Sequence, residues 1–166
     1  MRDHSKVSPQ FWTGRTGRQI RRAGDDALLT ALYLLTCPSA NMIGLYYLPL
    51  PTLCHETGRS LQGARKALQS LSEAEFAQYD EATEYVWVVK MAQFQIGEVL
   101  KPGDKRHSAV VRLLEEAKHS PFALRFHDSY AKAYGLPEMP LHAPSEGPPE
   151  PLRSQEQEQE NRAGAG

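Results

Sequence analysis

Residues 51–74, PTLCHETGRSLQGARKALQSLSEA, contain two helical patterns that are separated by a short turn. The first pattern begins with a proline and ends at Gly58, because proline suits the first turn of a helix and glycine suits its end. The second pattern follows Ser60, a favourable N-cap residue, and continues to about Ala74. A short turn that contains glycine often joins the helices of a helix-turn-helix motif. The segment therefore predicts this motif.

The second helix of the pair is amphipathic, and its polar face is free of acid. Its apolar residues share one helical face, which we expect to face the interior; they are Leu61, Ala64, Leu68 and Leu71. No acidic residue occurs between Arg59 and Leu71, and arginine, lysine and glutamine suit base edges and phosphates. In a helix-turn-helix, this helix lies in the major groove. The candidate DNA-binding residues here are Arg59, Ser60, Gln62, Arg65, Lys66 and Gln69. The alternative interpretation is an ordinary solvated face.

The preceding segment predicts a central helix and a short strand. Asp25 and Asp26 suit a helix start, and the apolar run that follows them stops before Pro38, since the residue before proline disfavours helical geometry. This helix is apolar on almost every side, which indicates a central position. Residues 41–48 combine a turn with aromatic and branched residues, as in a short strand.

The following segment predicts a β-hairpin. Residues 76–79 and 85–89 are rich in strand-forming residues and flank a polar tip. Helix, strand, helix, helix and hairpin, in that order, predict a winged helix-turn-helix fold that is mainly α-helical with a small β-hairpin. The tip is acidic, so we do not expect the wing to lie against phosphates. Its acidic residues are Asp80, Glu81 and Glu84.

The formal net charge of −1 over 166 residues conceals a strong polarity along the chain. Residues 1–24 carry six basic residues and one acidic residue, whereas residues 137–166 carry two basic and six acidic residues. Such asymmetry suggests an anion-binding N-terminal part and an acidic tail. The N-terminal segment is either an arm that follows phosphates or a leader anchored by Phe11 and Trp12. The arm would use Arg15, Arg18, Arg21 and Arg22.

The C-terminal third predicts two helices and a disordered tail. Helical patterns cover roughly residues 105–119 and 121–134, and the second carries an aromatic stripe at successive steps of four residues. The stripe either packs on its own domain or docks a partner or a second copy, which would make a homodimer. Its residues are Phe122, Phe126, Tyr130 and Tyr134. Proline and glutamate dominate the tail, which cannot bury enough apolar surface to fold.

Four segments follow from these patterns. They are a basic N-terminal arm (1–24), a winged helix-turn-helix domain (25–100), a helical extension (101–136) and a disordered acidic tail (137–166).

Several classes of protein are excluded by composition and motif. No apolar stretch approaches the roughly 20 residues of a membrane span, and no signal peptide follows the first residues. Two cysteines do not make a disulfide framework, which favours a cytoplasmic protein. Cys37, Cys54 and His55 lack zinc-ligand spacing, and Gly14 to Gly17 lacks the Lys-Ser/Thr of a phosphate-binding loop. We therefore expect no enzyme, no metal and no cofactor.

Two stretches resemble a known family. Residues 7–14 (VSPQFWTG) and residues 33–49 (YLLTCPSANMIGLYYLP) are similar to the N-terminal winged-helix domain of phage and prophage replisome-organiser, or replication-initiation, proteins. The resemblance extends over roughly residues 5–104. It implies a DNA replication factor of a bacteriophage or prophage that binds origin or single-stranded DNA and recruits a host helicase or its loader. Such organisers usually carry a second helical domain, whereas two expected helices and a tail follow here, as in a truncated or regulatory relative.

The sequence thus supports a DNA-binding protein of replication as its first hypothesis. A transcriptional regulator uses the same module and is an alternative. A winged helix that binds protein rather than DNA is a second alternative, with the aromatic stripe and the acidic tail as its contacts.

Overall fold

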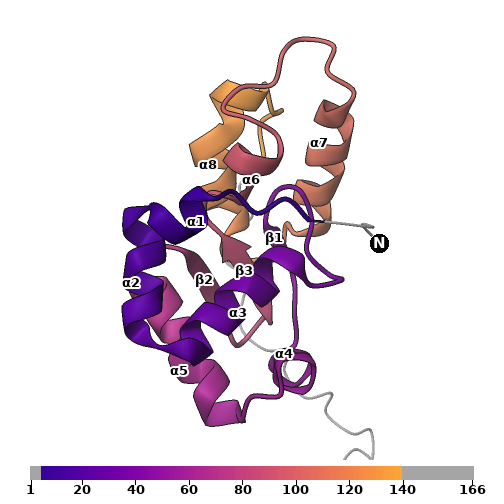
Figure 1. Cartoon of the computed structure of the whole chain (residues 1–166). Coiled ribbons are helices and arrows are strands. Elements are labelled where there is room, and N and C mark those ends of the chain that lie inside the picture. Colours follow the sequence, from indigo (N-terminus) through magenta and orange to yellow (C-terminus); the bar gives the residue numbers. More distant parts are fainter. Residues whose placement is uncertain (1–4, 140–166) are drawn as a thin grey trace, which may run out of the picture.

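The computed structural model describes residues 5–139, and in this part of the chain it contains eight helices and three strands (Figure 1). The fold is mainly α-helical with one small sheet, as the sequence predicts. The elements are α1 (Gln10–Thr13), α2 (Arg15–Ala23), α3 (Asp25–Thr36), β1 (Leu45–Tyr47), α4 (Leu50–Thr57), α5 (Leu61–Glu73), β2 (Ala77–Asp80), β3 (Tyr85–Val88), α6 (Met91–Gln95), α7 (Arg106–Glu116) and α8 (Ala123–Tyr134).

Local sequence explains the helix-turn-helix formed by α4 and α5. Gly58 ends α4 with a φ of 67°, a left-handed conformation that glycine adopts without strain. Ser60 caps α5, because its hydroxyl oxygen accepts a hydrogen bond from the Gly63 backbone N–H at 3.1 Å. The helix and its cap are confirmed. Leu61, which we expected to face the interior, is instead exposed in the first turn of α5.

The three strands form an antiparallel sheet in the order β1-β3-β2. Leu45 pairs with Trp87, and Tyr79 pairs with Val86, so β3 lies in the middle. The predicted strand over residues 41–48 is shorter because Asn41 organises a turn, in which its side-chain amide donates to the Leu45 carbonyl at 2.7 Å. Element order and strand order together are those of a winged helix-turn-helix. Its wing is the β2–β3 hairpin.

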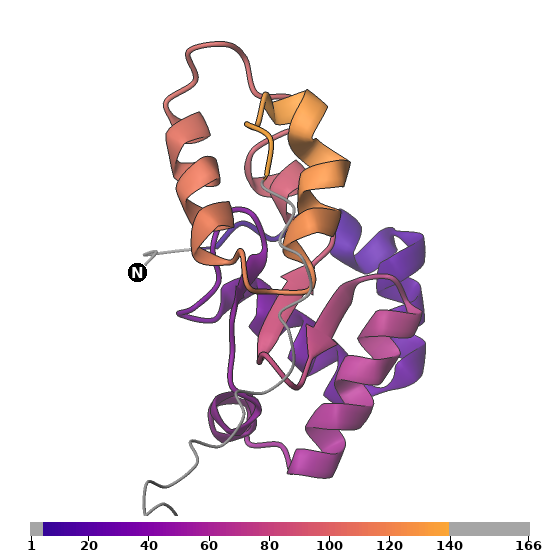
Figure 2. The same ribbon diagram turned by 180° about the vertical axis from the view of Figure 1, so that it is seen from behind.

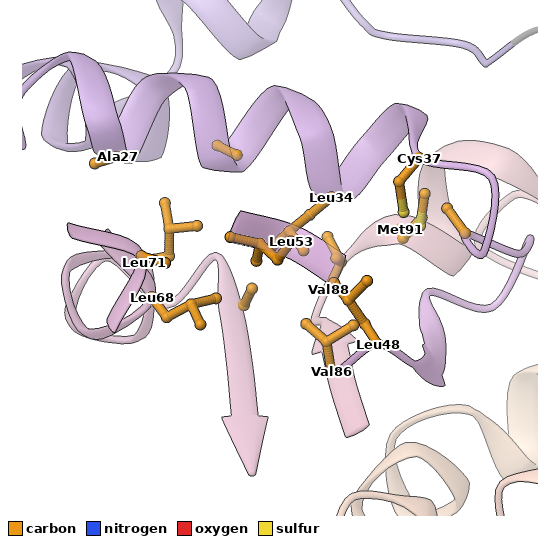
Figure 3. Close-up of a cluster of buried hydrophobic side chains, with 14 of the residues drawn as sticks. Ala27, Leu34, Cys37, Leu48, Leu53, Leu68, Leu71, Val86, Val88 and Met91 are labelled. Carbon is orange, nitrogen blue, oxygen red and sulfur yellow. The ribbon is translucent and has the colours of Figure 1, made fainter. Parts of the chain in front are cut away.

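Alternate residues of β3 contribute to two separate cores. Val86 and Val88 face the N-terminal core, which α3, α4 and α5 close with residues such as Leu34 and Leu71 (Figure 3). Trp87 faces the opposite side of the sheet and joins the C-terminal core. A strand that is buried on both faces explains why residues 85–89 show no polar alternation.

The C-terminal core lies between the sheet and helices α6, α7 and α8. Its largest fully buried side chains on α7 and α8 are Val110, Phe126 and Tyr134. Figures 1 and 2 show these helices at the end of the molecule opposite α4 and the start of α5. The predicted helices over residues 105–119 and 121–134 are present, and α6 is an additional short helix that the sequence analysis missed.

The N-terminal segment is folded onto the domain rather than extended from it. Residues 10–23 form α1 and α2, and α2 contacts both α3 and α5. Ile20 is buried, and Gly17 has no room for a side chain because an added Cβ would overlap the Phe11 carbonyl. Of the expected anchor, Phe11 packs against the N-terminal core, whereas Trp12 is exposed. The predicted arm is therefore a packed helical pair over residues 10–23.

The acidic tail predicted over residues 137–166 lies outside the described residues except for its first three positions. Among residues 5–139, no helix has the length and apolarity needed to cross a membrane.

Candidate nucleic-acid interface

The outward face of α5 presents polar side chains to solvent. Buried positions Ala64, Ala67, Leu68 and Leu71 occupy the opposite side of the helix, against α3 and β2. The outward residues fall at helical spacing and are all exposed; they are Gln62, Arg65, Lys66 and Gln69. Glu73 lies one turn beyond and accepts a hydrogen bond from the Gln69 amide at 3.1 Å. The candidate residues of α5 thus lie together on one surface, which we call the α5 face.

The wing partly neutralises this face. The Arg65 guanidinium donates to both carboxylate oxygens of Glu81, with its Nε at 3.1 and 3.2 Å. The hydrogen bond from Arg65 holds the pKa of Glu81 below its usual value. Both side chains are about half exposed, so water screens the pair and its contribution to stability is small. Arg65 is oriented by Glu81 but can exchange this carboxylate for another anion.

The turn before α5 is tied to the start of α3. Arg59 donates to Asp26 at 2.8 Å, and this pair connects the α4–α5 turn with the first turn of α3. Ser60 uses its hydroxyl oxygen as the helix cap, and its own hydroxyl proton remains available as a donor. Arg59 therefore has a structural partner that the sequence did not predict, whereas the capping role of Ser60 was predicted.

Helix α2 runs beside α5 in the opposite direction (Figures 1 and 2). At its start, Arg15 lies 3.5 Å from Glu75, just after the end of α5. At its end, α2 leads into Asp26, which lies near Gly63 in the first turns of α5. The helix that carries these arginines therefore lies along the flank of α5, and it is a packed helix rather than an arm.

The four arginines of α2 differ in their contacts. Arg15 pairs with Glu75, and Arg18 donates to the Thr13 carbonyl at 3.0 Å. Arg21 and Arg22 occupy the last turn, are exposed, and have no ion-pair partner within residues 5–139. Lys66 on the α5 face is likewise without a carboxylate partner in the described part of the chain. Among the candidate DNA-binding cations, these three are the ones that an anion can reach without displacing an ion pair or hydrogen bond found within residues 5–139.

Comparisons with protein-family models, curated proteins and solved structures found no match for this chain. The geometry of the α5 face and of the helix beside it is therefore what points to a function.

The aromatic stripe on α8, predicted either to pack on its own domain or to bind a partner, packs mostly on its own domain. Phe122, Phe126 and Tyr134 are buried in the C-terminal core. Tyr130 is half-buried and donates its hydroxyl to the Val89 carbonyl at 3.1 Å, while Tyr134 donates to the Gly97 carbonyl at 2.7 Å. Burial raises the pKa of both tyrosines. The stripe is covered because α6 and the C-terminal end of β3 pack apolar side chains against it.

The nucleophilic and metal-ligating side chains form no assembled site in the described residues. Cys37 is buried beside Tyr46, and burial raises the pKa of its thiol. Within residues 5–139, no group of three His, Cys, Asp or Glu side chains is placed to hold a metal ion.

Sequence reasoning missed two acidic neighbours of the candidate residues, Glu81 and Asp26. The acidity of the wing tip was visible in the sequence, but its contact with Arg65 was not. The two residues are 16 positions apart, and only the fold of the hairpin brings them together. Asp26 was recognised as part of a helix start and not as the partner of Arg59.

Proposed function

We propose that this protein binds DNA through the α5 face, with α5 placed in the major groove. The observation that carries the proposal is an exposed helix face without acid over three turns, at the position of the second helix of a helix-turn-helix. Glutamine pairs with adenine N6 and N7, and arginine or lysine donates to guanine O6 and N7. Gln62 supplies such a group directly, Gln69 does so once it leaves its hydrogen bond to Glu73, and Lys66 adds a cation for a neighbouring phosphate.

Arg65 joins the interface by exchanging its partner. An exposed ion pair is worth about 0.2–1 kcal/mol, so releasing Arg65 from Glu81 costs little. A phosphate or guanine offers the guanidinium a comparable bidentate acceptor. Glu81 therefore competes with DNA for Arg65, but only weakly.

Arg21 and Arg22 contribute phosphate contacts on the flank of α5. They are exposed and lie in the last turn of α2, which leads into Asp26 beside Gly63 in the first turns of α5. Contacts of this kind fix the position of the protein on the duplex without reading its sequence. They also make affinity depend on salt, because each neutralised phosphate releases counterions.

The wing stays away from the phosphates. Glu84 accepts a hydrogen bond from the Tyr47 hydroxyl at 2.6 Å, and Asp80 accepts from the Thr83 backbone N–H at 2.9 Å. These carboxylates hold the hairpin in shape and repel a nearby phosphate. The helix, rather than the wing, therefore dominates the footprint.

Fluorescence anisotropy of labelled duplex and single-stranded DNA across a salt series tests the proposal. With Lys66, Arg21 and Arg22 on phosphates, we expect log affinity to fall with log salt at a slope of about −3 on duplex DNA. The absence of binding to either form at low salt would contradict DNA binding. It would favour the alternative of a winged helix that binds protein.

We propose DNA replication as the process, on the resemblance of residues 7–14 and 33–49 to replisome organisers. A host helicase or its loader is then the expected protein partner. Nuclease-treated affinity purification from the producing cell, followed by mass spectrometry, tests this role. Enrichment of the helicase or its loader supports replication, whereas enrichment of RNA polymerase would indicate a transcriptional regulator.

A further inference from the structure

A cavity of about 300 Å³ lies between the N-terminal segment and the end of the wing. Residues 6–8, α1 and α2 form one side, and the turn between β3 and α6 forms the other. Val88 and Met91 in this wall lie near the Cys37 end of α3 (Figure 3). The cavity is separate from the α5 face, and its volume is at the lower end of the range, about 300–1,000 Å³, found for small-molecule sites.

The interior of the cavity is apolar. The rings of Phe11 and Phe76 pack edge to face on one wall, with their centroids 6.2 Å apart. Phe94 also lines the cavity, and about half of its surface is exposed. A large exposed ring next to a cavity leaves apolar surface in water that a ligand could cover. The remaining apolar lining comes from Val7, Ile20, Leu35, Val88 and Met91.

The charged residues of the lining are predominantly basic. Lys6, Arg15 and Lys90 line the cavity together with a single carboxylate, that of Glu75. Arg15 lies 3.5 Å from Glu75, and both side chains are largely exposed, so this ion pair is weak. Lys6 and Lys90 have no carboxylate partner in the part of the chain that the structure describes. The lining therefore carries a net positive charge around an apolar interior.

The walls are held in place by contacts of their own. The Gln95 amide donates to the Lys6 carbonyl at 3.0 Å, which fastens the N-terminal segment to α6. Gly17 allows α2 to pass directly against the Phe11 carbonyl, so α1 and α2 form one rigid wall. A preformed cavity binds a ligand with a smaller loss of conformational entropy than one that must be assembled.

We propose that this cavity binds a small apolar carboxylate, with its hydrocarbon part among the phenylalanine rings and its carboxylate at Lys6 and Lys90. Apolar walls select the hydrocarbon, and the basic lining selects a negative over a neutral or positive head group. The proposal does not depend on DNA binding.

Isothermal titration calorimetry with four probes tests the chemistry of the site. Octanoate and 3-phenylpropionate each carry a carboxylate, on an aliphatic and an aromatic body respectively. Octanol and octylamine have an aliphatic body like that of octanoate, but their head groups are neutral and positively charged. We expect saturable binding of at least one acid, and affinity for octanol and octylamine at least fivefold weaker than for octanoate. No saturable binding of either acid, or equal binding of octylamine, would overturn the proposal.

Backbone NMR shifts and two variants locate the site. Octanoate should shift the amides of Thr16, Lys90 and Phe94, which line the cavity. Lys90→Glu should raise the Kd of octanoate about fivefold, while Lys101→Glu, the same charge change outside the cavity, leaves it unchanged. Thr16→Phe should fill the space and abolish binding, with circular dichroism confirming an unchanged fold. Shifts confined to other residues, or equal effects of the two lysine variants, would place the ligand elsewhere and contradict the assignment.

Discussion

The α5 face and the aromatic stripe of α8 make an instructive pair. Both are sets of side chains at helical spacing that the sequence offers as binding surfaces. The structure leaves the polar set on α5 exposed and buries most of the aromatic set of α8 in the C-terminal core. An apolar stripe gains free energy when apolar surface of its own chain covers it. Burying a charged face would instead cost the desolvation of its charges, so such a face stays in water. The polar face of α5 is therefore the one of these two surfaces that stays open to a partner.

The largest expected effect concerns the buried aromatic stripe of α8. Phe126→Ala removes a fully buried ring from the C-terminal core, and large-to-small changes of this kind typically cost about 3–5 kcal/mol. The free energy of unfolding, measured by urea denaturation with circular dichroism, should fall by that amount. Leu124→Ala, two residues earlier on an exposed side of α8, should change it by less than about 1 kcal/mol. Equal losses would contradict the burial of the stripe.

The next effect concerns the flank of the exposed face. Replacing both Arg21 and Arg22 by alanine should reduce the salt slope of DNA affinity by about two and weaken low-salt binding about tenfold. The weakening should be similar for unrelated DNA sequences, because phosphates are contacted. A matched variant with Lys101→Ala and Arg112→Ala removes the same charge from the C-terminal region. If both double variants lose affinity equally, net charge and not α2 is responsible.

A smaller effect sharpens the role of the wing. Glu81→Gln frees Arg65 from its carboxylate partner, so the Kd for duplex DNA should fall about two- to threefold. Glu116→Gln removes a comparable exposed ion pair, with Arg112 on α7, and should leave the Kd unchanged. Anisotropy titrations at fixed salt measure both. Weaker binding by Glu81→Gln would show that the carboxylate positions Arg65 for DNA more than it competes with DNA.

The smallest effect contrasts Arg65 with Arg106, an arginine that is held for structure. Arg106 donates to Asp104 through Nε and Nη2, at 3.0 and 2.7 Å, and to the Ile96 carbonyl at 2.9 Å. The side-chain hydrogen bond lowers the pKa of Asp104 from 3.8 to about 2. The pair therefore stabilises the fold fully above pH 3.8 and loses its effect as pH falls through about 2. Carboxyl NMR titration should give that pKa, and a value near 3.8 would contradict the contact.

Much of the winged helix could be predicted from sequence because its signals are local. Gly58 and Ser60 mark the turn and the cap of α5 regardless of what lies around them. The period of the apolar residues of α5 then predicts which side faces the core. Of the four apolar residues predicted to face the core, only Leu61 does not, because it lies in the first turn, where α5 extends beyond the core.

The N-terminal helices and the ion pairs of the α5 face could not be predicted in the same way. Helix α2 contains Ile20 as its single large apolar residue, so its sequence offers too few apolar positions to predict which side faces the core. Gly17 argues against a helix locally, and only its contact with Phe11 shows why it is there. The Arg65–Glu81 pair depends on how the wing folds back over α5. Tertiary contacts, rather than local preferences, decide these features.

DNA affinity after charge reversal on the α5 face tests the central claim most directly. Lys66→Glu is compared with Lys101→Glu, which makes the same charge change in the loop at the opposite end of the molecule from α5 (Figures 1 and 2). We expect Lys66→Glu to raise the Kd for duplex DNA at least tenfold, and Lys101→Glu to leave it within about twofold, with both melting temperatures unchanged. Equal Kd values for the two variants would contradict DNA binding through α5.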